Sequence, residues 1–208
     1  MSDLEVPYYL ARPSGPVAAG VIVIHEGGGI TSQLLRVCER LAHEGYAVAA
    51  PDLFFRSGGP EAASFLELIG ALDNDQVLDD LATAAGTLRG LGARRIGVTG
   101  FCMGGRFTWH AALHGEGYDA AAGFYGSGIA GDLGEPRCPT LLFFGGNDPY
   151  IPAADIEAVA THHPDTVVYP GAGHGFLRDG SDDYHAEAAS DAWARMLAHF
   201  RRHLVDAG

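Results

Sequence analysis

Short apolar runs alternate with helical patterns along the chain, and this alternation limits the possible folds more than any other feature. Runs typical of buried strands occur at 17–24, 47–50, 96–99, 120–125, 140–144 and 166–169. Apolar residues recur at helical spacing behind Thr31 and behind Asp73, and further helices are expected at 106–113, 153–161 and about 184–204. Alternating strands and helices form a mostly parallel sheet covered on both faces. We therefore expect the α/β class, with ligands bound beyond the carboxyl ends of the strands.

The length of 208 residues is that of one domain. The segment 53–95 already has to hold two helices, which leaves no room for a large cap domain. We therefore predict a single α/β domain over residues 1–208, with a comparatively open site for a small substrate.

The charged residues argue against several classes of function. The formal net charge is −13, which disfavours an extended surface for nucleic acid or an anionic membrane. All 13 basic residues are arginine, so a Schiff-base lysine and the lysine of a phosphate-binding loop are both excluded. No apolar run is long enough to span a membrane, and the stretch MSDLEVPYYL lacks the pattern of a signal peptide. We therefore expect a cytoplasmic protein with no nucleic-acid or membrane partner.

The cysteines and histidines give no strong metal signature. Cys38, Cys102 and Cys138 form no C-x-x-C pair, which argues against a disulfide framework and a zinc cluster. His110 and His114 lie four residues apart on a predicted helix, but they lack the adjacent glutamate of H-E-x-x-H, so we interpret them as ordinary surface or core histidines. No metal and no other cofactor is expected.

The stretch GFCMGG at 100–105 stands between a predicted strand and a predicted helix. It fits the nucleophile elbow G-x-S-x-G with cysteine in place of serine, and no G-x-S-x-G occurs elsewhere in the chain. The glycines let strand and helix approach closely while the nucleophile takes a strained conformation, and the helix N-terminus favours a thiolate. Cys102 is therefore the candidate nucleophile, with a buried structural cysteine as the alternative.

A nucleophilic cysteine needs a base, and the base needs an acid that orients it. Asp148 follows the predicted strand at 140–144, and His174 follows the next one at 166–169. Alone, Asp148 could be a turn residue that caps a helix, and His174 could be an ordinary loop histidine. Together they complete the chain order nucleophile, acid, histidine that α/β-hydrolases use.

With these motifs in place, the sequence resembles the dienelactone hydrolases (carboxymethylenebutenolidases) over nearly its whole length. The resemblance is carried by HEGGG, PDLFFR, GFCMGG, GGNDPYIP and GAGHGF, in the family's order. It implies an α/β-hydrolase fold, a triad of Cys102, Asp148 and His174, and hydrolysis of a small lactone or ester through a thioester. It also implies an oxyanion hole made by the backbone N–H groups of Met103 and Gly27.

The resemblance extends to residues around the triad. Glu26 looks like the family's acid that pairs with the resting thiol and helps to activate it, with a helix-capping carboxylate as the alternative. Arg56 and Arg178 match two arginines that grip a substrate carboxylate, which suits the forked guanidinium. Phe124 is a further expected substrate contact and stands where a tyrosine is usual, and Gly175 stands where a serine is usual. These two departures concern the shape and polarity of the pocket.

Two other functions remain open at this stage. A general small-molecule carboxylesterase of the same fold would keep the triad and ignore a substrate carboxylate. A non-catalytic thiol redox sensor or binding protein would keep the fold and a reactive cysteine. The expected partner is a small lactone or ester, in particular an anionic one, bound by a monomer or a small homo-oligomer.

Overall fold

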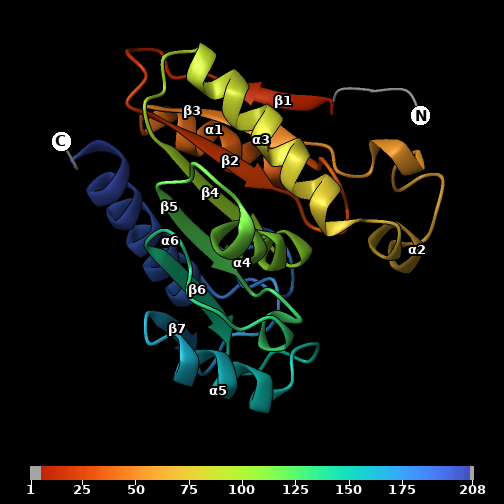
Figure 1. The fold of residues 1–208 in the computed structure, drawn as a ribbon. Helices are drawn as coiled ribbons and strands as arrows, with labels where there is room; N and C mark the ends of the chain where they lie inside the picture. The colour runs from red at the N-terminus through yellow and green to blue at the C-terminus, as the bar shows by residue number, and fades with distance from the viewer. Residues whose placement is uncertain (1–5, 207–208) are drawn as a thin grey trace.

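The computed structural model describes residues 6–206, which form a seven-stranded sheet with helices on both faces (Figure 1). The strand order is β1-β3-β2-β4-β5-β6-β7. β1 is antiparallel to β3, and every other neighbouring pair is parallel. The strands are β1 (Tyr8–Ala11), β2 (Ala19–Ile24), β3 (Tyr46–Pro51), β4 (Ile96–Phe101), β5 (Ala120–Phe124), β6 (Thr140–Gly145) and β7 (Thr166–Tyr169).

The helices bury the two faces of the sheet separately. Val21 and Val23 of β2 pack in one apolar cluster with α1 and α6, whereas Ile22 and Ile24 pack in another with α3 and α4 (Figure 1). This division follows from the alternation of side chains along a strand. The helical elements are α1 (Ser32–His43), η1 (Phe55–Ser57), α2 (Phe65–Gly70), α3 (Asn74–Gly90), α4 (Met103–His114), η2 (Ile129–Gly131), α5 (Ala153–His162), α6 (Ala186–Phe200) and η3 (Arg201–Val205).

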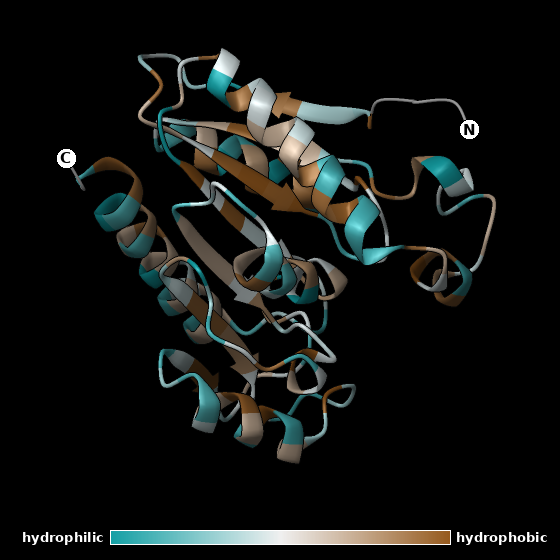
Figure 2. Ribbon diagram, in the orientation of Figure 1, coloured by the Kyte–Doolittle hydropathy of each residue, from teal (hydrophilic) through white to brown (hydrophobic). Residues whose placement is uncertain are grey.

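The central strands are apolar on both sides, as Figure 2 shows by their brown colour. Every residue of β2, β4 and β5 is buried. Strands covered on both faces read as continuous apolar runs rather than alternating ones, which is why the sequence pattern revealed them. The predicted mostly parallel sheet flanked by helices, the arrangement of an α/β-hydrolase, is confirmed.

Two details differ from the sequence-based expectation. β1 was not expected, because it has four residues and only Ala11 at its end is fully buried. α4 begins at Met103, directly after Cys102, rather than near residue 106. Between β3 and β4 the described chain holds only η1, α2 and α3, so no cap domain is inserted there. None of the helices in residues 6–206 has the length and apolar character needed to cross a membrane.

The fold brings the predicted site residues to one edge of the sheet. Glu26 comes two residues after β2, Cys102 directly after β4, Asp148 three residues after β6, and His174 in the loop after β7. These four strands are parallel, so their carboxyl ends share one edge. Polar and reactive side chains therefore meet where an open parallel sheet binds its ligands.

Candidate active site

The backbone at Cys102 is strained in the way that a nucleophile elbow requires. Its φ is 55° and its ψ −119°, a backbone conformation that residues other than glycine rarely adopt. A Cβ at Gly100 would lie 2.3 Å from the carbonyl oxygen of Gly104, and one at Gly104 would lie 2.3 Å from that of Ile24. A Cβ at Gly105 would lie 2.2 Å from the carbonyl oxygen of Phe124. The glycines of GFCMGG are thus needed because backbone from three strands meets the start of α4 at this turn.

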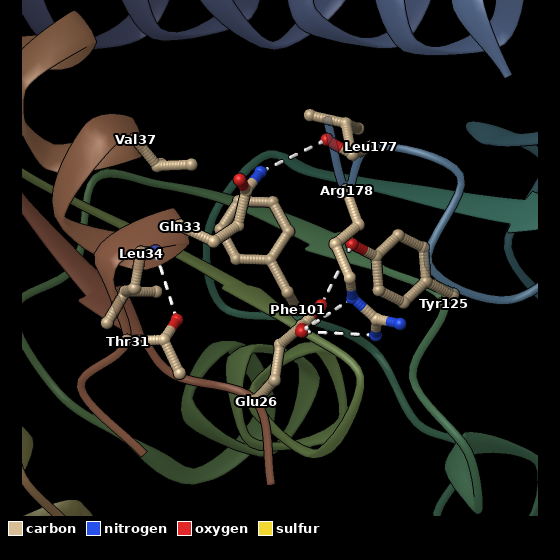
Figure 3. Close-up of a pocket in the computed structure, with 9 residues that line it drawn as sticks. All are labelled: Glu26, Thr31, Gln33, Leu34, Val37, Phe101, Tyr125, Leu177 and Arg178. Atoms are coloured by element: carbon tan, nitrogen blue, oxygen red, sulfur yellow. Dashed lines mark hydrogen bonds and ion pairs between the residues drawn. The ribbon is translucent and has the colours of Figure 1, made fainter. Parts of the chain in front are cut away.

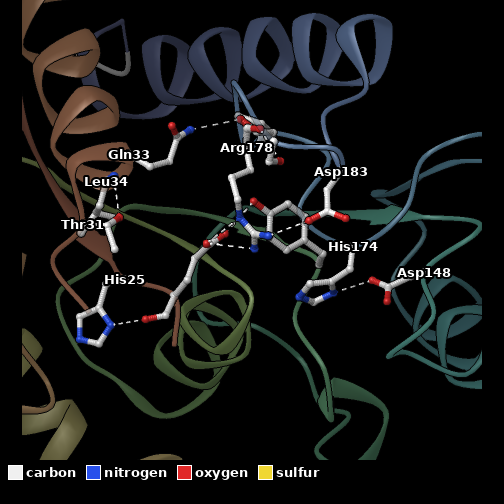
Figure 4. Close-up of polar contacts among 12 residues, drawn as sticks. His25, Thr31, Gln33, Leu34, Asp148, His174, Arg178 and Asp183 are labelled. Carbon is white, nitrogen blue, oxygen red and sulfur yellow. Dashed lines mark hydrogen bonds and ion pairs between the residues drawn. The ribbon is translucent and has the colours of Figure 1, made fainter. Parts of the chain in front are cut away.

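Asp148 and His174 form the acid–histidine half of the predicted triad (Figure 4). Nδ1 of His174 lies 2.8 Å from Oδ2 of Asp148, whose side chain is fully buried. The other oxygen of Asp148 accepts hydrogen bonds from the backbone N–H groups of Tyr150 and Ile151, at 2.8 and 3.2 Å. Asp148 therefore both closes the turn after β6 and orients the imidazole. It does not cap α5, whose N-cap is Pro152.

The same contacts determine the charge of His174. Burial opposes protonation of the ring, but hydrogen bonds with Asp148 and with the sulfur of Cys102 outweigh it and raise the pKa of His174 from 6.5 to about 9. An imidazolium at neutral pH favours negative charge on the neighbouring sulfur. His174 thus has both Asp148 and the sulfur of Cys102 as neighbours, as the predicted triad requires.

Glu26 lies at the centre of a second polar network (Figures 3 and 4). Its Oε1 accepts a hydrogen bond from the Tyr125 hydroxyl at 3.2 Å, and its Oε2 lies 3.2 and 3.1 Å from Nε and Nη2 of Arg178. Arg178 also binds Asp183 at 2.8 Å through Nη1. The backbone of Glu26 is fixed by His25, whose Nδ1 donates to the Glu26 carbonyl oxygen while its Nε2 accepts from Leu53. Glu26 is therefore paired with an arginine and a tyrosine in this structure.

Arg56 and Arg178, the two arginines expected to grip a substrate carboxylate, each have a carboxylate partner within the protein. Arg56 makes a two-pronged ion pair with Asp80 of α3, with distances of 2.7 and 2.8 Å. The carboxylate of Asp80 is nearly buried, with 6% of its side chain exposed, so it needs this partner. Both arginines are already bound to protein carboxylates.

Phe124 is placed in the core and does not face the site. Its side chain is fully buried between Phe101 and Phe143, with ring centroids 5.0 and 4.7 Å away. The expected substrate contact at Phe124 is therefore wrong, because the last residue of β5 points into the sheet's apolar face. The next residue, Tyr125, lies beside His174 instead, with a centroid distance of 5.1 Å.

Tyr125 is the site residue that the sequence analysis missed. Its φ of 38° is positive, as is that of Cys102, which directly follows the adjacent strand β4. Burial, and then the neighbouring Glu26 carboxylate, raise the pKa of its hydroxyl well above 10, so it remains a hydrogen-bond donor. Its position at the end of the predicted strand at 120–125 was the available signal, since the other site residues also lie just beyond strand ends.

The two residues expected to form the oxyanion hole lie at the same edge. Met103 is the first residue of α4, where the N–H groups point out of the helix without intrahelical partners. Gly27 follows Glu26 in the turn after β2, and Phe65 of α2 packs against it so closely that a Cβ at Gly27 would lie 1.8 Å from the ring. A side chain at residue 27 would displace Phe65.

A small cavity lies behind the Glu26–Arg178 pair (Figure 3). Its volume is about 20 Å³, which accommodates about one water molecule. Its lining is polar at Glu26 and Arg178 and apolar at Leu34, Phe101 and Leu177. A lactone does not fit inside it unless the Glu26 side chain is displaced.

Gly175 explains one departure from the expected pattern. Its φ is 74°, and a Cβ there would lie 2.9 Å from the Cζ of Arg178. A glycine after His174 thus lets the guanidinium lie against the loop backbone while it binds Glu26.

Comparison with known proteins relates nearly the whole chain to a single protein family. The sequence profile of the dienelactone hydrolase family matches residues 6–204. A candidate carboxymethylenebutenolidase of Yersinia pestis is 36% identical over 98% of this chain and 86% of its own. The corresponding protein of Escherichia coli K12 is 36% identical over 96% of this chain and 83% of its own.

Solved structures agree with this grouping. A candidate dienelactone hydrolase from Klebsiella pneumoniae superposes with a TM-score of 0.85 and 36% identity, covering 95% of this chain and 93% of its own. A dienelactone hydrolase-like promiscuous phosphotriesterase from metagenomic libraries has a TM-score of 0.70 and 28% identity, covering 91% and 88%. The matched region contains all the motifs that surround the candidate site.

Proposed function

Because the chain belongs to the dienelactone hydrolase family, we propose that this hydrolase opens a small enol lactone that carries a carboxylate. Cys102 is the proposed nucleophile, His174 its proton carrier and Asp148 the residue that orients His174. The observation that carries the proposal is the strained, half-buried Cys102 beside His174, whose Nδ1 lies 2.8 Å from a buried carboxylate.

The proposed reaction has two steps. The sulfur of Cys102 attacks the lactone carbonyl carbon, and the backbone N–H groups of Met103 and Gly27 stabilise the oxyanion. The ring carbon–oxygen bond breaks, the ring oxygen takes the proton of His174, and a thioester remains. Neutral His174 then accepts a proton from water, the hydroxide attacks the thioester, and the carbon–sulfur bond breaks. The ring-opened acid leaves, with a thiolate and an imidazolium restored.

Arg178 is the proposed partner of the substrate carboxylate. It is held by Glu26 at 3.1 and 3.2 Å and by Asp183 at 2.8 Å, so an incoming carboxylate has to replace one of them. Replacing Glu26 would leave its carboxylate paired with Tyr125 alone. The released Glu26 is then a second acceptor for the proton of Cys102 in molecules that still carry a neutral thiol.

A general carboxylesterase is the second candidate, and a specific observation favours it. Arg56 is bound by Asp80, and Arg178 by Glu26 and Asp183, so a substrate carboxylate meets no unpaired guanidinium from either residue. A neutral ester would need no such exchange. The triad and the oxyanion hole would serve both substrates equally.

Turnover of two matched substrates tests the proposal. One substrate is an enol lactone with a free carboxylate and the other is its methyl ester, each assayed before and after treatment with iodoacetamide. Cys38 and Cys138 are buried, so alkylation of the folded protein reports on Cys102.

Faster turnover of the free acid than of the methyl ester, with both activities lost on alkylation, would support the lactonase. Equal turnover of acid and methyl ester, lost on alkylation, would favour the general esterase. Turnover that survives complete alkylation of Cys102 would remove the nucleophile from both proposals.

A further inference from the structure

A cluster of three potential metal ligands lies on the surface away from the candidate active site. His110 and His114 are one turn apart on α4, and Asp132 follows η2. Counted along the helix axis, the two histidines lie about 12 Å and 18 Å beyond Cys102. The sequence analysis treated them as ordinary histidines because the third member comes from a different element.

The two imidazoles converge on one carboxylate. Nδ1 of His110 lies 3.2 Å from Oδ2 of Asp132, and Nε2 of His114 lies 3.4 Å from the same oxygen. One ligand atom from each residue can be chosen so that all three lie within 4.8 Å of one another. In a tetrahedral zinc site with bonds of about 2.0–2.1 Å, neighbouring ligand atoms are about 3.3 Å apart. The observed separations from the carboxylate match that spacing.

The backbone of Asp132 is held in place independently of the histidines. The buried indole of Trp109 donates from Nε1 to the backbone carbonyl oxygen of Asp132 at 2.7 Å, and the Asp132 N–H donates to Ile129 at 3.0 Å. Nε2 of His110 is buried and has no hydrogen-bond partner, whereas Nδ1 faces Asp132, so Nδ1 is the ring nitrogen available to a metal. The backbone of Asp132 and the mostly buried His110 are therefore fixed, and the exposed side chains of His114 and Asp132 can adjust at the surface.

We propose that His110, His114 and Asp132 bind a divalent cation of the zinc class, separately from the catalytic centre. Two imidazoles and one carboxylate suit Zn²⁺ or Co²⁺ better than Mg²⁺ or Ca²⁺, which prefer oxygen ligands. His114 and Asp132 are about half exposed, so the ion can enter from solvent and keep a water molecule as its fourth ligand.

Metal titration of the full-length chain tests this site. We would use a Cys102→Ala background, so that the active-site thiol cannot bind the metal, and titrate Co²⁺ by absorption and Zn²⁺ by calorimetry. His114→Ala and Asp132→Asn each remove one ligand, and both changes are at exposed side chains. The matched control is His203→Ala, because His199 and His203 are also four residues apart, with ring centroids 4.7 Å apart, but form no ligand cluster with a carboxylate among residues 6–206.

We expect one equivalent of metal to bind, at least about tenfold more weakly in His114→Ala and in Asp132→Asn and unchanged in His203→Ala. Zn²⁺ should also raise the Tm of the parent and of His203→Ala, but not that of His114→Ala. Absence of binding by the parent, or equal affinity in His114→Ala, would overturn the proposal.

Discussion

The two halves of the candidate site differ in what holds them in place. Around Cys102, backbone approaches between β4, β2, β5 and α4 fix the geometry, and glycines are required at 100, 104 and 105. Around Glu26 the geometry depends on ion pairs between long side chains, in which Arg178 binds both Glu26 and Asp183. The first half is set by the fold itself, whereas the second can rearrange when a charged ligand arrives.

The strongest test of the first half is Cys102→Ala. We expect kcat/KM to fall by at least about 10⁴-fold, because the thiol forms the covalent bond and the oxyanion hole alone supplies only residual catalysis. Tm should change little, since Cys102 is only half-buried. Measured turnover near that of the wild type would show that another residue is the nucleophile.

Asp148→Asn is expected to have the next largest effect. Loss of the orienting carboxylate lowers kcat by up to about 10⁴-fold in serine enzymes. It should also lower the pKa of His174, which contacts with Asp148 and Cys102 hold at about 9. The alkaline limb of kcat/KM, expected near pH 9 in the wild type, should therefore move to lower pH. An unmoved limb would mean that Asp148 does not control the proton of His174.

The pKa of His174 also determines how the free energy of unfolding changes with pH. The folded-state pKa lies above the ordinary value of 6.5, so protonation of His174 stabilises the fold fully below pH 6.5. That contribution is lost as pH rises from about 6.5 to about 9. Urea unfolding of the wild type should show this loss, and unfolding of Asp148→Asn should show less of it.

Arg178→Gln and Arg56→Gln test whether the second half is adaptable. Arg178→Gln should lower kcat/KM on the carboxylate-bearing lactone by about 10–100-fold, since a charged hydrogen bond contributes about 1.5–3 kcal/mol. Its effect on the methyl ester should be small. Equal losses on both substrates in Arg178→Gln would argue against carboxylate binding there.

Arg56→Gln should chiefly lower the free energy of unfolding, because it leaves the nearly buried Asp80 without its partner.

The same contrast separates what the sequence predicts from what it does not. The parallel strands follow from the apolar runs in the sequence. The common edge at which Cys102, Asp148 and His174 lie follows from their chain order and from the geometry of a parallel sheet. The partners of Glu26, Arg56 and Arg178 do not follow, because a long side chain can reach several carboxylates from one backbone position. Phe124 was misassigned for a related reason: successive residues at a strand end point to opposite faces, so an error of one position exchanges the core for the site.

Stability measurements at two glycines give the smallest expected effect and compare the elbow with an ordinary helix. In Gly104→Ala the new methyl group would meet the Ile24 carbonyl oxygen at 2.3 Å, and overpacking of this kind costs about 1–3 kcal/mol of unfolding free energy. Gly86→Ala in α3 is the control, because nothing lies within 4 Å of its Cβ position. Alanine there should stabilise the helix by up to about 1 kcal/mol. Urea denaturation that gave both variants the same change would show that the elbow glycines are not required by close backbone contact, and the distinction between the two halves of the site would lose its physical basis.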